Sequence, residues 1–144
     1  SCRALQAIPG GLFTNNTAAT NFSYCFYGCT GLKAIPEGLF AKNAEAINFN
    51  CSFYGCTYMM FNPNIFVDPA ATEQDKLNRF IDKNMDFRNC FYQVNLHNNS
   101  GTAPALWDYV KGSGQWKTTN CFKGCIMLNS EDIPDYSAWG TPKF

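Results

Sequence analysis

Charged side chains are scarce in this 144-residue sequence. Asp, Glu, Lys and Arg make up 15% of the chain, against about a quarter in a typical domain. Eleven basic residues balance eleven acidic ones, so the formal net charge is zero. Such a surface lacks the basic patch that binds nucleic acid or anionic lipid. We therefore expect no nucleic-acid partner.

Long apolar runs are absent, and histidine is nearly so. No run of about 18 apolar residues exists, so we expect no membrane insertion. No basic and then apolar leader opens the chain. The single histidine, His97, lies beside Leu96 and Asn98 and has no neighbouring carboxylate to orient it. Because cysteine–histidine or serine–histidine catalysis would depend on this one base, we expect no enzyme, no catalytic residue and no cofactor.

What the sequence does contain is a repeat. The segment CFYGCTGLKAIPEGLF at 25–40 recurs in part at a spacing of 27 residues, so that Cys29 aligns with Cys2 and Cys56. A fixed period of this size predicts a stack of similar units, each contacting mainly its neighbours. We therefore expect function on a surface rather than in one cleft.

The repeat predicts a fold class and a division of the chain. Each unit has a Gly-Leu-Phe turn, a short helical segment rich in Asn, Ala and Thr, and an extended piece ended by Pro. We predict an α/β repeat, a leucine-rich-repeat-like solenoid of about four coils with short parallel strands and a C-terminal cap. The single domain 1–144 would comprise regular repeats at 1–63, a helical insert at 64–85, divergent repeats at 86–125 and the cap at 126–144. Since Ser1 falls halfway through a repeat, we expect a fragment of a longer protein.

The insert carries the clearest helix signal. Asp68 before Pro69 is one possible start, and Thr72 with Asp75 three residues later is another. Apolar residues at helical spacing would form one face, namely Leu77, Phe80, Ile81 and Met85. Charges of both signs alternate along the segment, which indicates a solvated, ion-paired face rather than an acid and base pair. Those charged residues are Asp68, Glu73, Asp75, Lys76, Arg79, Asp82, Lys83, Asp86 and Arg88.

The eight cysteines follow the repeat. Cys2, Cys29, Cys56 and Cys125 share one repeat position, whereas Cys25, Cys90 and Cys121 share another, and Cys51 falls at the position of Tyr24. We interpret the shared positions as a structural ladder of buried free thiols that act as small hydrophobes. Disulfides are the alternative, although their geometry is selective. A zinc site in the C-x-x-x-C pairs is disfavoured because the two pairs lie at opposite ends of the stack.

The segment CFYGCTGLKAIPEGLF resembles the leucine-rich repeats of the BspA-like type, in particular those of gut Bacteroidales and their phages. The resemblance is strong over residues 2–63, weaker at 86–94 and 119–134, and absent from 64–85. It implies an extracellular adhesion module on a bacterial cell surface or a phage virion. Its partner would be a host or bacterial surface protein or a glycan.

The strand side of the repeat provides a candidate binding surface. One outward residue per coil would form a binding stripe of Gln6, Lys33, Met60, Asn98 and Asn129. We expect a non-enzymatic recognition module, with a spacer domain that binds nothing as the alternative. Trp107, Trp116 and Trp139 could stack on sugars, although packing in the core and cap is the more common use of tryptophan.

Overall fold

Short helices joined by turns make up the regular structure of this chain. The computed structural model describes residues 2–97 and 101–143. The helices are α1 (Glu73–Asn78), the 3-10 helices η1 (Leu106–Tyr109) and η2 (Ser130–Asp132), and α2 (Tyr136–Trp139). Within these described ranges the parallel pairings are isolated bridges, such as Asn21 with Asn48, and they form no sheet. The expected α/β repeat with parallel strands and helical segments is therefore wrong.

Consecutive turns explain why strands do not form. In the first repeat the backbone N–H groups of Cys25, Tyr27 and Cys29 donate to the carbonyl oxygens three residues earlier. Tyr24 and Gly28 both have positive φ angles, 59° and 65°. Because a new turn begins every two residues, the backbone cannot remain extended over the length of a strand. The Asn- and Thr-rich segments that were expected to be helical are likewise turns.

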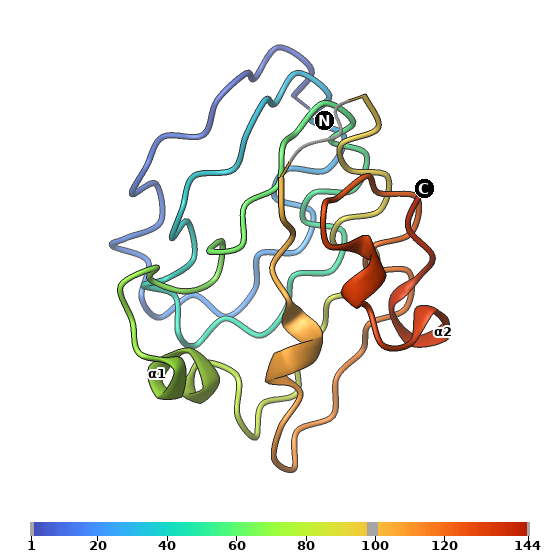
Figure 1. Ribbon diagram of the computed structural model, residues 1–144. Coiled ribbons are helices and arrows are strands. Elements are labelled where there is room, and N and C mark those ends of the chain that lie inside the picture. The colour runs from blue at the N-terminus through green and yellow to red at the C-terminus, as the bar shows by residue number, and fades with distance from the viewer. Residues whose placement is uncertain (1, 98–100, 144) are drawn as a thin grey trace.

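The repeats nevertheless stack on one another, because the alternate N–H groups point to the next turn. Phe22, Phe26 and Gly28 donate to the carbonyl oxygens of Asn48, Ser52 and Tyr54 at 2.7–2.8 Å. The same pattern joins the second turn to the third and the third to the fourth. Figure 1 shows the blue, cyan and green turns of the N-terminal half side by side, with the red C-terminal segment on the opposite side of the molecule.

Columns of phenylalanine rings fill the core between the turns. Phe26, Phe53, Phe91 and Phe122 stack in sequence, with neighbouring ring centroids 5.4, 5.5 and 5.5 Å apart. Phe22, Phe49 and Phe87 form a second column, and Phe13, Phe40 and Phe66 form a third. Equivalent side chains from successive repeats therefore lie over each other and exclude water from the interior.

The thiols lie along the same stack, and all eight cysteines are free. Cys56 Sγ donates to the carbonyl oxygen of Phe26 in the preceding repeat, and Cys125 Sγ donates to that of Phe91. Ser52 makes the equivalent bond through its hydroxyl, to the carbonyl oxygen of Phe22 at 2.8 Å. Cys2 and Cys25 are exposed, whereas the other six cysteines are buried.

The insert forms a shorter helix than its pattern suggested. Helix α1 is capped by Thr72, whose hydroxyl accepts a hydrogen bond from the Asp75 N–H at 3.1 Å. It ends at Asn78, so Phe80 and Met85 lie beyond it and are buried in the core instead. The later of the two possible starts is thus the one used, because the Thr72 side chain satisfies an N–H group that the helix itself leaves unpaired.

Candidate functional site

Three of the five predicted stripe residues lie side by side on successive repeats. The Lys33 N–H donates to the Gln6 carbonyl oxygen at 3.2 Å, and the Met60 N–H donates to the Lys33 carbonyl oxygen at 2.9 Å. Each follows a more buried residue, as Lys33 follows Leu32 and Met60 follows Met59, both fully buried. The side chains of Gln6, Lys33 and Met60 therefore face outward on one surface.

The other two predicted stripe residues do not continue this row. Asn98 lies outside the described residues. Gly101 lies beside Met60 and Phe61, because a Cβ atom on that glycine would meet the Phe61 backbone oxygen and nitrogen at 2.5 and 2.7 Å and Met60 Cγ at 3.0 Å. The Gly101 carbonyl oxygen accepts a hydrogen bond from the Leu128 N–H at 3.0 Å, so Leu128 lies beside Gly101 on the following repeat. Asn129 instead pairs its carboxamide with both backbone groups of Ala103, at 2.9 and 3.0 Å.

Residues outside the predicted stripe extend the surface. Leu128 is the most exposed large hydrophobic side chain described, at 67%. Tyr58 is exposed, with the Lys33 Nζ 5.1 Å from its ring centroid and the His97 ring stacked on it at 4.2 Å. We call this surface the outward face, and it consists of Gln6, Lys33, Tyr58, Met60, His97 and Leu128. The sequence pattern that indicates an outward-facing Tyr58 is its place two residues before Met60, with the buried Met59 between them.

A groove opens at one end of the outward face. It has a volume of about 300 Å³ and lies between two neighbouring repeats, with Gln6, Ala7 and Ile8 on one side and Lys33, Ala34, Ile35 and Pro36 on the other. Ile8 and Ile35 are buried, so the lining is apolar in its depth, while Gln6 and Lys33 are exposed at the rim. The groove can hold an apolar side chain of a ligand beside a polar rim.

The tyrosine side chains form a separate column with few free ring faces. Tyr27, Tyr54 and Tyr92 stack with centroids 4.9 and 4.6 Å apart. At one end of the column the Tyr24 ring packs against the Tyr27 ring, with centroids 5.6 Å apart. At the other end the Lys123 Nζ lies 6.0 Å from the centroid of the Tyr92 ring. Because sugars stack on ring faces, this column offers mainly ring edges and hydroxyl groups.

The three tryptophans pack against the core rather than forming a sugar-binding platform. Trp107 and Trp139 have centroids 6.2 Å apart, and Trp116 and Trp139 are 6.3 Å apart. Trp107 also packs edge-on against Phe122 at 5.7 Å. The glycan-stacking hypothesis therefore finds no exposed cluster of indole rings in residues 2–97 and 101–143.

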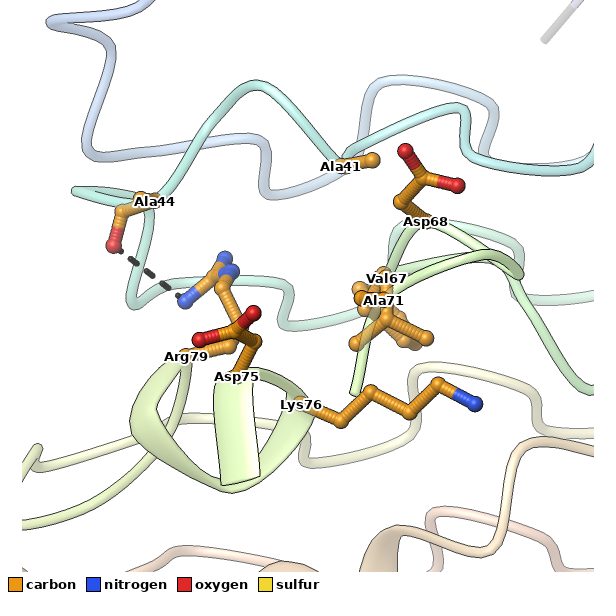
Figure 2. Close-up of a pocket in the computed structure, with 9 residues that line it drawn as sticks. Ala41, Ala44, Val67, Asp68, Ala71, Asp75, Lys76 and Arg79 are labelled. Atoms are coloured by element: carbon orange, nitrogen blue, oxygen red, sulfur yellow. Dashed lines mark hydrogen bonds between the residues drawn. The ribbon is translucent and has the colours of Figure 1, made fainter. Parts of the chain in front are cut away.

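A second pocket lies beside α1, and a buried arginine is among the residues that line it. Its volume is about 210 Å³, and Figure 2 shows it between the insert and the second repeat, lined by Ala41, Ala44, Val67, Asp68, Asp75 and Arg79. Only 7% of Arg79 is exposed. Its guanidinium donates to the carbonyl oxygens of Asn43, Ala44 and Ala46 at 3.0–3.3 Å.

Burial of this arginine carries an electrostatic cost. Desolvation lowers the Arg79 pKa to about 10, and the nearby Glu45 opposes that shift only in part. The solvated, ion-paired helix face that the sequence suggested is therefore wrong at this position, since Arg79 is buried against carbonyl oxygens. On α1 itself, Lys76 forms an ion pair with Glu73, with Nζ and Oε1 3.2 Å apart. Arg79 thus joins the insert to the loop 43–46.

Burial suppresses the reactivity of four of the thiols. Desolvation raises the pKa of Cys56 and of Cys125 to about 12, and it raises the pKa of Cys90 and Cys121 well above the ordinary value. These thiols are protonated at neutral pH and are poor nucleophiles.

Over the described ranges no three His, Cys, Asp or Glu side chains cluster so that they could hold a metal ion. No described helix has the length and apolar character needed to cross a bilayer.

The chain was compared with protein-family models, with curated proteins and with solved structures, and no match was found in any of the three. The resemblance to BspA-like leucine-rich repeats therefore stays a prediction from the residues 25–40 and their recurrences. The geometry of the outward face is the available guide to function.

Proposed function

We propose that this chain is a non-enzymatic recognition module that binds a surface protein or glycan through the outward face. The observation that supports the proposal is the row of exposed side chains that Gln6, Lys33 and Met60 form on successive repeats, with Leu128 following beyond Gly101. Apolar Met60 is 41% exposed and Leu128 is 67% exposed, and the exposed Tyr58 ring lies beside Lys33. Large exposed apolar side chains that gather on one surface are typical of interaction sites. Tyrosine and methionine are enriched in protein interfaces.

Of the two ligand classes, a protein fits this surface better. The Tyr58 ring is already covered by His97 and Lys33, and the tyrosine column is stacked on itself. A sugar ring would therefore find few aromatic faces. An apolar side chain of a protein ligand could enter the groove between Ile8 and Ile35, while other parts of the same ligand contact Met60 and Leu128. The location that fits such a module is the bacterial cell surface or a phage particle, as the resemblance implies.

Two pairs of variants test the outward face. Wild type would first be screened against arrayed glycans and a panel of purified bacterial and host surface proteins. With the ligand found in that screen, Lys33→Glu and Met60→Asp should each weaken binding by about 10-fold or more, as expected for residues central to an interface. Each variant has a matched control away from the outward face. Lys42→Glu makes the same charge change as Lys33→Glu on another exposed lysine, and Val110→Asp replaces an apolar side chain with the same 41% exposure as Met60.

The controls should bind as wild type does. Equal losses for Lys42→Glu and Lys33→Glu would show that the outward face is not the binding site. If the folded wild-type chain bound no member of either panel, the alternative of an architectural spacer would be favoured. Thermal unfolding of each variant separates loss of binding from loss of fold.

A further inference from the structure

The two ends of the stack differ in how their backbone groups are paired. At the C-terminal end, the Phe122 N–H donates to the Trp139 carbonyl oxygen at 2.8 Å, and the Gly124 N–H donates to that of Thr141 at 2.9 Å. The Trp139 ring covers Phe122 with centroids 6.0 Å apart. The segment around α2 thus pairs two of the N–H groups that the last turn presents, those of Phe122 and Gly124.

At the N-terminal end the corresponding groups are carbonyl oxygens, and they are open. Every later turn accepts N–H groups from the turn before it at four equivalent positions; in the second turn these acceptors are Asn48, Asn50, Ser52 and Tyr54. Their equivalents in the first turn are Asn21, Ser23, Cys25 and Tyr27. These four carbonyl oxygens accept no hydrogen bond from any residue that the structure describes. The first turn therefore ends in a row of hydrogen-bond acceptors, which we call the acceptor edge.

Side chains beside the acceptor edge are also less covered than their counterparts. Cys25 is exposed, whereas Ser52, Cys90 and Cys121 at the equivalent position are fully buried. Phe26 retains 7% exposure, and Phe53 retains none. Phe13 is only partly buried, while Phe40 below it is fully buried. Both the polar and the apolar parts of the first turn thus lack the neighbour that every later turn has.

We propose that the acceptor edge is a docking surface for one further repeat of the same Phe-x-x-Cys type. Such a repeat presents a row of N–H groups on the side that faces the next turn, as Phe22, Phe26 and Gly28 do here. It also presents phenylalanine rings that would continue the columns above Phe22 and Phe26. Addition of a segment to an open backbone edge is a common mode of polypeptide recognition.

A second copy of this chain is a poor occupant. Two acceptor edges placed together would face carbonyl oxygen against carbonyl oxygen and could form no hydrogen bonds. At the C-terminal end of a second copy, the outward N–H groups of Phe122 and Gly124 are already bonded to Trp139 and Thr141, and the Trp139 ring covers Phe122. A repeat whose N–H groups are free satisfies both the acceptors and the rings.

The test adds that repeat in register. A copy of residues 10–27, with Ser at the position of Cys25 as in the second repeat, is joined directly before Ser1, which continues the 27-residue period. The amides copied from Phe22, Tyr24 and Phe26 should then donate to Asn21, Ser23 and Cys25. Hydrogen exchange measured by NMR should show them about 100-fold or more slower than in an unstructured peptide.

A matched control carries the same added residues in scrambled order, and its amides should exchange at the unstructured rate. The amides of Phe49 and Phe53 in the second turn report whether the host chain is folded in both proteins. If those stay protected while the three added amides exchange freely, the proposal is wrong. It is equally wrong if sedimentation shows the unextended chain to be a dimer that protects the first turn, because the occupant is then a second copy.

Discussion

Arg79 provides the sharpest test of how the insert is held on the stack. Its guanidinium donates to three carbonyl oxygens from a site with 7% exposure. Two of these acceptors have a second donor, since the Asn43 oxygen accepts the Ala46 N–H and the Ala44 oxygen accepts Lys83 Nζ. The Ala46 oxygen has no other donor in the part of the chain that the structure describes. Arg79→Met would therefore leave one buried acceptor unpaired.

The expected loss follows from these contacts. An unpaired buried carbonyl costs about 1–3 kcal/mol, and the two weakened acceptors add to that loss. Removal of the buried charge works in the opposite direction, because its desolvation is what lowers the Arg79 pKa. We expect Arg79→Met to lower the free energy of unfolding by about 2 kcal/mol, and Arg79→Lys to lower it by less, because an ammonium group can still bond one or two of the oxygens.

Urea unfolding followed by tryptophan fluorescence measures these differences. Lys111→Met removes a positive charge from an exposed side chain and should change stability by less than about 0.5 kcal/mol. If Arg79→Met proved as stable as Lys111→Met, the hydrogen bonds would contribute no more than the desolvation costs. The argument that Arg79 fastens the insert would then be refuted.

Two further predictions concern the core and the acid response. Phe53→Ala removes a ring stacked on both sides and should cost about 3–5 kcal/mol, whereas Phe26→Ala at the acceptor edge should cost clearly less; equal losses in urea unfolding would contradict the stacking account. Burial opposes ionisation of Asp86, but hydrogen bonds from Arg88 outweigh it and hold its pKa below the ordinary 3.8. The resulting stabilisation is complete above about pH 5 and is lost as the pH falls through the lower folded-state pKa, so Asp86→Asn should flatten the acid unfolding profile. A profile unchanged from wild type would show that the carboxylate contributes nothing.

The stacking of the repeats was predictable because identical residues recur at one spacing. Phe26 and Phe53 are 27 positions apart, and their rings stack at 5.4 Å. The local conformation was not predictable in the same way. Tyr24 and Cys51 occupy equivalent positions with φ of 59° and 55°, although neither residue type signals a left-handed backbone. Strands were expected because extended segments and tight turns carry the same alternating apolar pattern.

The candidate site was predictable only where the spacing stays regular. Gln6, Lys33 and Met60 follow the 27-residue period, and they align. Beyond Met60 the chain length between equivalent positions changes, so the places predicted for Asn98 and Asn129 are taken by Gly101 and Leu128. The 27-residue spacing alone could not identify these two residues. Arg79 was missed because a buried arginine bonded to carbonyl oxygens has the same sequence pattern as one on a solvated helix.

The stack keeps its geometry while the length of chain per repeat varies. Successive members of the column Phe26, Phe53, Phe91 and Phe122 are 27, 38 and 31 residues apart, yet their rings keep spacings of 5.4–5.5 Å. The distance between layers is thus set by the turns alone, and the connecting segments are free to differ. A scaffold of this kind can accept new loops between its turns, and so acquire new surfaces, without a change in the spacing of its layers.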